Sequence, residues 1–170
     1  MTPVSFEGAT FAATSIHGPP WEPDYAFSPD PDPDDPNDRY EWRSNPKDSL
    51  PHNITVTFPK KKRIVKLSFG YRRSFINAPT EVELWATNSP LRVDASGFLI
   101  GEVVADFLVG VSKTDWGTRK PRFVIEVPES DDKESYATYG ILVLRSANMF
   151  NVAMADVKMW EAIEDPRCRV

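Results

Sequence analysis

Short segments in which apolar and polar residues alternate are the feature of this sequence that most restricts its fold. Residues 53–58, NITVTF, place Ile54, Val56 and Phe58 on one side of an extended chain, and residues 81–87, EVELWAT, repeat the pattern. Alternation with a period of two is typical of a β-strand that buries one face. These segments therefore predict a β-sheet with one side packed against a core.

The remaining apolar segments extend this prediction along most of the chain. They are rich in β-branched and aromatic residues and are bounded by glycine, proline or asparagine, which favours strands over helices. The further predicted strands are residues 63–71, 97–110, 122–127, 139–147 and 151–162. A helical period appears only weakly, around Glu22–Phe27. We therefore expect an all-β fold, an antiparallel jelly-roll-like β-sandwich of about eight strands with long N-terminal loops.

Size and charge narrow the classes of protein to be considered. A chain of 170 residues fits a single domain, 1–170, with one core. The net charge of −5 argues against nucleic acid as a partner, because such binding depends on neutralising phosphates. Cys168 is the single cysteine, so no internal disulfide forms, and the chain starts without a secretory signal pattern. We expect an intracellular protein, or an extracellular one if this is an excised domain.

An acidic, proline-rich loop over residues 28–38 raises the possibility of a cation site. Its carboxylates have the spacing of a helix-flanked calcium loop, but Asp35 stands where that loop needs glycine, and several prolines interrupt it. That kind of calcium site is therefore rejected. Two hypotheses stay open: a solvated loop kept extended by its own charge, and a cation site of another kind.

Residues that would support catalysis are few. His17 and His52 are the two histidines, and both lie in loops bounded by prolines, without the spacing of metal ligands. The sequence holds no glycine-rich phosphate loop, no serine nucleophile elbow and no pair of cysteines. We therefore expect a protein that is not an enzyme.

Five segments, taken in order, resemble the discoidin or coagulation factor V and VIII type C domains, which have a galactose-binding-like fold. Two of them are DRYEWRSNP, which resembles a signature containing a buried tryptophan, and the hairpin HNITVTFPKKKRIVKLSFGYR. The five segments are residues 8–28, 38–46, 52–72, 80–89 and 139–161. The resemblance implies a β-sandwich in which Ala26 and Trp42 point into the core.

The resemblance also implies a structural calcium ion, because carbohydrate-binding relatives of this fold hold one beside the corresponding loop. Matched residue by residue, its ligands would be Asp30, Asp32, Ser44, the carbonyl of Ala155, and Asp156. Calcium takes six to eight oxygen ligands, and this set with water supplies enough of them.

Loops at one end of the predicted sandwich contain aromatic and basic residues that suit a ligand. An aromatic ring stacks on the apolar face of a sugar while charged or amide groups bond its hydroxyls. The candidate ligand-binding residues are Trp21, Arg72, Arg73, Phe75, Trp116 and Arg119. We expect a non-catalytic module that binds carbohydrate through these loops. An intracellular protein-protein interaction domain is the alternative, and binding of anionic lipid is a third hypothesis that the acidic charge disfavours.

Overall fold

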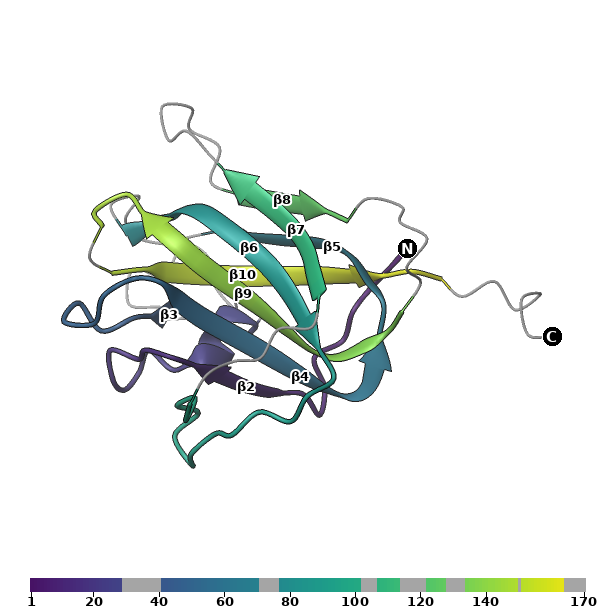
Figure 1. Ribbon diagram of the computed structural model, residues 1–170, viewed down its shortest axis with the longest axis horizontal. Coiled ribbons are helices and arrows are strands. Elements are labelled where there is room, and N and C mark those ends of the chain that lie inside the picture. The colour runs from purple at the N-terminus through teal and green to yellow at the C-terminus, as the bar shows by residue number, and fades with distance from the viewer. Residues whose placement is uncertain are drawn as a thin grey trace.

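Two antiparallel β-sheets stack face to face in the protein (Figure 1). The structure is a computed structural model that describes residues 1–28, 41–70, 77–101, 107–113, 122–127, 134–149 and 151–163. No helix among these residues is long and apolar enough to span a membrane. The predicted all-β sandwich is confirmed, and the weak helical pattern near Glu22 forms a single turn of 3₁₀-helix, η1 (Pro23–Ala26).

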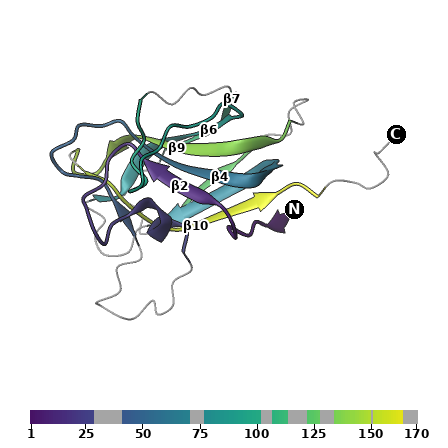
Figure 2. The same cartoon turned by 90° about the horizontal axis from the view of Figure 1, so that it is seen from below.

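Each sheet contains five strands. The first sheet has, in spatial order, β2 (Thr10–Ala13), β4 (His52–Lys62), β9 (Tyr136–Ser146), β6 (Pro79–Thr87) and β7 (Phe107–Lys113). The second has β1 (Thr2–Pro3), β10 (Ala153–Glu161), β5 (Ile64–Gly70) and β8 (Arg122–Glu126), and β3 (Trp42–Arg43) also pairs with β10. Figure 2, seen from below, shows β10 in the layer beneath β2, β4 and β9.

The core lies between the sheets and follows the alternation of the sequence. Ile54 and Val56 of β4 are fully buried and face the second sheet, to which β5 contributes Leu67 and Phe69. Burying a large aliphatic or aromatic side chain contributes about 1.5–3 kcal/mol. Ala26 is fully buried as well, as the resemblance implied.

Residues 97–110 do not form the single strand that the sequence predicted. Gly97 has a φ of 83°, and the chain there bonds back to Ala13 of β2, while β7 starts only at Phe107. A turn at Asp94 precedes it, in which the carboxylate accepts hydrogen bonds from the backbone N–H groups of Ser96 and Phe98. A hydrogen bond from the Ser96 hydroxyl, together with these backbone bonds, lowers the pKa of Asp94. Short apolar runs do not encode such a turn, so periodicity alone misassigned the segment.

The strand register brings the connecting loops together at one end of the sandwich. Ala13 pairs with Ile54, Gly70 with Ala155, and Pro79 with Ser146, so these strands begin or end at the same edge, on the left in Figure 1. We call this end the rim. Its described residues are 14–22, 41–51, 77–78, 146–149 and 151–152.

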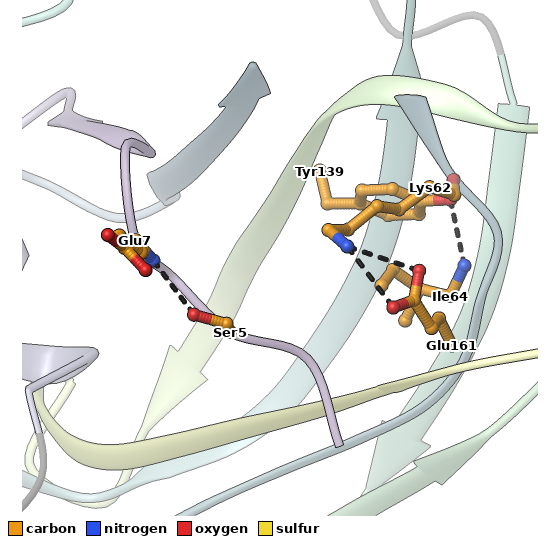
Figure 3. Close-up of polar contacts among 6 residues, drawn as sticks. All are labelled: Ser5, Glu7, Lys62, Ile64, Tyr139 and Glu161. Carbon is orange, nitrogen blue, oxygen red and sulfur yellow. Dashed lines mark hydrogen bonds and ion pairs between the residues drawn. The ribbon is translucent and has the colours of Figure 1, made fainter. Parts of the chain in front are cut away.

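At the opposite end, a tyrosine hydroxyl fastens the hairpin between β4 and β5 (Figure 3). The buried Tyr139 donates a hydrogen bond to the carbonyl of Lys62 at 2.7 Å and accepts one from the backbone N–H of Ile64 at 3.1 Å. The ammonium of Lys62 also pairs with Glu161 of β10, at 3.1 and 3.2 Å from its two oxygens. The hairpin is thereby tied to both sheets.

Replacing Tyr139 by phenylalanine should lower the free energy of unfolding by about 1–3 kcal/mol, because a buried N–H and a carbonyl lose their shared partner. Urea unfolding measures the change. Tyr136→Phe is the matched control, since its hydroxyl contacts Glu134 at a long 3.4 Å, and we expect a smaller loss there. Equal losses in the two variants would contradict the role of the Tyr139 hydroxyl.

Candidate functional site

Trp21 lies at the rim, where its segment is attached to β3. The backbone N–H of His17 donates to the carbonyl of Arg43 at 2.8 Å, and the N–H of Arg43 donates to the carbonyl of Trp21 at 3.4 Å. The Arg43 guanidinium lies 4.3 Å from the centre of the Trp21 ring. A cation of the chain itself therefore occupies one face of the indole, so a ligand cannot stack on that face.

Glu41 is a buried carboxylate at the same corner. It is 1% exposed and forms an ion pair with Arg43, two residues further along the chain. Its second oxygen, Oε2, has no hydrogen-bond partner within the described part of the chain. A buried carboxylate oxygen without a donor is costly, so this oxygen is a potential ligand for a cation or for water.

A second polar group, Ser15 with Asp48, holds the loop between β3 and β4. The Ser15 hydroxyl donates to the Asp48 carboxylate at 2.6 Å and accepts from the backbone N–H of Asn45 at 2.9 Å. The carbonyl of Ser15 accepts the indole N–H of Trp42 at 2.9 Å. Because the Ser15 hydroxyl donates its proton to the Asp48 carboxylate, we infer that these two residues stabilise the loop between β3 and β4.

His52 starts β4 next to this loop and is buried. Its Nε2 has no hydrogen-bond partner among the residues described. Burial lowers the pKa of His52 below its ordinary value of 6.5, against the attraction of Asp48, which raises it. His52 is therefore neutral at pH 7 and has little access to a ligand.

Acidification should destabilise the protein through His52. A pKa that is lower in the folded than in the unfolded state means that the unfolded chain takes up the proton first. The stability that neutral His52 contributes is fully present above the unfolded pKa of 6.5. It is lost as the pH falls from there towards the folded pKa. Melting temperatures measured between pH 7.5 and 5 should decline, and His52→Gln should reduce the decline. An unchanged decline in His52→Gln would contradict this prediction.

Four polar residues at the rim form a hydrogen-bond network centred on Asn148, which we call the amide cluster: Asn77, Ser146, Asn148 and Asn151. The Asn148 amide nitrogen donates to Oδ1 of Asn77 at 2.7 Å and to Oδ1 of Asn151 at 2.6 Å. The Asn148 oxygen accepts from the Ser146 hydroxyl at 3.1 Å and from the backbone N–H of Asn151 at 3.2 Å. The network ties the segment before β6 to the loop between β9 and β10.

An exposed apolar side chain lies next to the amide cluster. Met149 is 78% exposed and has a φ of 62°, a left-handed conformation that is unfavourable for a residue with a side chain. The loop holds this conformation while Asn148 and Asn151 make their bonds on either side. The rim thus presents amide groups and an apolar surface together.

The structure describes only part of the site predicted from the sequence. Trp21 is at the rim, and its role in ligand binding stays a prediction. The other ligand-binding candidates and two of the calcium candidates lie outside the described residues: Arg72, Arg73, Phe75, Trp116, Arg119, Asp30 and Asp32. In the sequence, Arg72, Arg73 and Phe75 lie between β5, which ends at the rim edge, and β6, which begins there. Trp116 and Arg119 lie between β7, which ends at that edge, and β8, which begins there. The acidic loop of residues 28–38 is likewise described only at Ser28.

The register of β3 and β10 separates Ser44 from the other described calcium candidates. Ser44 bonds to Val152 through its backbone N–H and through its hydroxyl, which accepts from the Val152 N–H at 2.8 Å. Val152 lies three residues before Ala155 and four before Asp156, and its N–H donates to the Ser44 hydroxyl. Ser44 therefore lies opposite Val152, and its role as a calcium ligand stays a prediction. Among the described residues, no three acidic, histidine or cysteine side chains form a group that could hold a metal.

Glu41 is the acidic residue that the same register brings towards Ala155. Trp42 pairs with Met154, so the residue before Trp42 runs alongside the residue after Met154. Asp156 has a φ of 51° and lies in an irregularity of β10 between Ala155 and Lys158. Its carboxylate also contacts the Lys158 ammonium at 3.4 Å.

The amide cluster was not predicted from the sequence. Asn77 and Asn148 are 71 residues apart, and asparagine is common in turns for purely local reasons. The weak signal is the position of these asparagines directly beside predicted strands, where loops carry ligand-binding residues.

Comparisons with known proteins establish what the fold resembles. No protein-family model matches the chain, and no curated protein matches it. Among solved structures, it is similar to the family 32 carbohydrate-binding module of Clostridium perfringens NanJ in complex with galactose. The TM-score is 0.62 at 16% identity, over 93% of this chain and 97% of that one.

Two further structures give the same result. The Clostridium perfringens module CpGH89CBM32-5, in complex with GalNAc-β-1,3-galactose, has a TM-score of 0.60 at 13% identity, over 94% of this chain and 99% of that one. Chitosan-binding module 1 of a Paenibacillus chitosanase/glucanase has a TM-score of 0.59 at 12% identity, over 89% and 93%. The expected galactose-binding-like fold is thereby confirmed. At these identities the likeness concerns the fold, and it does not single out the discoidin or type C domains.

Proposed function

We propose that the protein is a non-catalytic carbohydrate-binding module with its ligand site at the rim, around the amide cluster. The observation that carries this proposal is the network of Asn77, Asn148 and Asn151, which positions amide groups next to the exposed Met149. The similar solved structures that contain galactose or GalNAc support the same class of ligand.

The chemistry of the rim suits a sugar. Amide groups bond hydroxyl and carbonyl oxygens, and an apolar side chain packs against the C–H face of the ring. Because the network fixes the asparagine side chains before a ligand arrives, little side-chain entropy is lost on binding.

The polar side chains that could act in catalysis are instead bonded or buried within the fold. The Ser15 hydroxyl is bonded to Asp48, and His52 is buried with a lowered pKa. These observations support a binding module and favour it over a hydrolase. A protein partner or anionic lipid, the two other hypotheses from the sequence, remain predictions.

Calorimetric titration with galactose and with GalNAc tests the proposal. We expect both sugars to bind, and Asn148→Ala to abolish binding because it removes the centre of the network. Asn88→Ala is the matched control at the opposite end, where Asn88 accepts from the backbone N–H of Ala137, and it should bind like the wild type. Equal binding by Asn148→Ala would place the site elsewhere, and failure of the wild type on a broad glycan array would contradict the function.

We also propose calcium as a structural ligand, with Glu41, the carbonyl of Ala155 and Asp156 as its described ligands in place of Ser44. The buried, unpartnered Oε2 of Glu41 and the left-handed Asp156 support this set. Calcium should raise the melting temperature of chelator-treated protein, since it binds only the folded state. The increase should disappear in Asp156→Asn and persist in Ser44→Ala. No increase at millimolar calcium would refute the proposal.

A further inference from the structure

We propose that the rim site selects sugars that offer an acceptor-only oxygen, namely the carboxylate of a uronic acid or the carbonyl of an N-acetyl group. The inference rests on the proposed function and concerns the substituent that the amide cluster recognises. It follows from the direction of each hydrogen bond within the cluster.

A backbone group fixes the orientation of the Asn148 amide. The N–H of Asn151 can only donate, and it lies 3.2 Å from the Asn148 side chain, so an oxygen must face it. The Ser146 hydroxyl donates to this same oxygen. The amide nitrogen of Asn148 is thereby turned towards Asn77 and Asn151. Reversing the amide would set two donors against each other.

The orientation of Asn148 then determines that of its two neighbours. Its nitrogen carries two hydrogens, and one goes to Oδ1 of Asn77 while the other goes to Oδ1 of Asn151. Both neighbours therefore direct their own NH₂ groups away from Asn148. Both side chains are partly exposed, so these NH₂ groups are available to a ligand at the rim. The amide cluster therefore presents hydrogen-bond donors to a ligand.

The outward NH₂ groups of Asn77 and Asn151 match some sugar substituents better than others. A carboxylate or an N-acetyl carbonyl accepts from such a donor without bringing a donor of its own, and bonds to a charged acceptor are the stronger. A hydroxyl can accept, but its proton needs a partner in turn. The ammonium of an amino sugar offers only donors and leaves the asparagine NH₂ groups without an acceptor, which costs affinity.

Titration of the full chain with four monosaccharides that share one ring tests this inference. We expect galacturonate and GalNAc each to bind roughly five-fold or more tightly than galactose, and galactosamine to bind most weakly. Galacturonate offers a carboxylate and GalNAc offers an N-acetyl carbonyl, so comparing the two affinities shows which acceptor the site prefers. The titrations are run at 0.15 M salt, where the net charge of −5 acts over a short range.

Asn148→Asp provides a sharper test, because it should reverse the preference. A carboxylate at position 148 only accepts, so Asn77 and Asn151 would turn their NH₂ groups inward and their oxygens outward. Galactosamine should then bind more tightly than galacturonate or GalNAc. Ala147→Asp is the matched control: Ala147 is exposed, and the change adds the same charge one residue away and keeps the amide directions, so GalNAc should still bind more tightly than galactose.

Asn77→Asp gives a second readout that keeps the bond from Asn148. It removes one outward NH₂ group, and it should lower the affinity for galacturonate and GalNAc more than for galactose. Melting curves confirm that each variant is folded. If the wild type binds all four sugars equally, or binds galactosamine best, the inference is wrong while the proposed function stands. If no sugar binds, the proposed function fails with it.

Discussion

Replacing Trp42 by alanine should lower the free energy of unfolding by about 3–5 kcal/mol, the range for deleting a large buried aromatic side chain. Trp42 is fully buried, and its indole N–H donates to the carbonyl of Ser15 at 2.9 Å. Its backbone pairs with Met154, so the same residue links β3, β10 and the loop that follows β2. The alanine variant would contain a cavity and an unpaired carbonyl together.

Urea unfolding measures this change, with Trp160→Ala as the control. Trp160 is partly exposed on β10, where the ammonium of Lys66 lies 5.4 Å from its ring centre. Its loss should cost clearly less than that of Trp42. If the two variants are destabilised alike, the links that Trp42 makes between β3, β10 and the loop after β2 do not stabilise the fold as we infer.

Replacing Ser15 by alanine should cost about 2–3 kcal/mol, because one hydroxyl serves two groups that would both lose a partner. These groups are the Asp48 carboxylate at 2.6 Å and the backbone N–H of Asn45 at 2.9 Å, and Ser15 itself is fully buried. Bonds to a charged group are stronger than the average, which places this serine near the upper end for a single hydroxyl.

Ser5→Ala is the matched control for Ser15→Ala. Ser5 is exposed, and its hydroxyl accepts only a 3.2 Å bond from the backbone N–H of Glu7 (Figure 3). We expect this variant to unfold within about 0.5 kcal/mol of the wild type. A loss for Ser15→Ala as small as that for Ser5→Ala would show that the loop between β3 and β4 does not depend on the Ser15 hydroxyl.

Most of the fold could be predicted from local sequence patterns. Alternation in β4 and β6 identified strands and their buried faces, because one side of each strand meets the core and the other does not. The burial of Trp42 and Ala26 followed from the resemblance. The prediction of one strand over 97–110 was wrong because the path of its first residues depends on bonds from Gly97 and Leu99 to Ala13, which is far away in the chain.

The candidate site was harder to predict, because it depends on contacts between distant residues. Asn77 and Asn148 gain a role only when β6 and β9 pair. Ser44 matched a ligand position by its place in the sequence, yet it lies opposite Val152, several residues from Asp156. Register decides which polar side chains meet, and a sequence without its partner strands does not specify register.

The central claim, that a sugar binds at the rim around the amide cluster, is tested most directly by NMR titration of the ¹⁵N-labelled protein with GalNAc. We predict that the side-chain NH₂ signals of Asn77, Asn148 and Asn151 and the backbone signal of Met149 shift together and saturate. The signals of Lys60 and Lys61, at the opposite end, should stay unchanged. Saturable shifts at that end with none in the amide cluster would contradict the account.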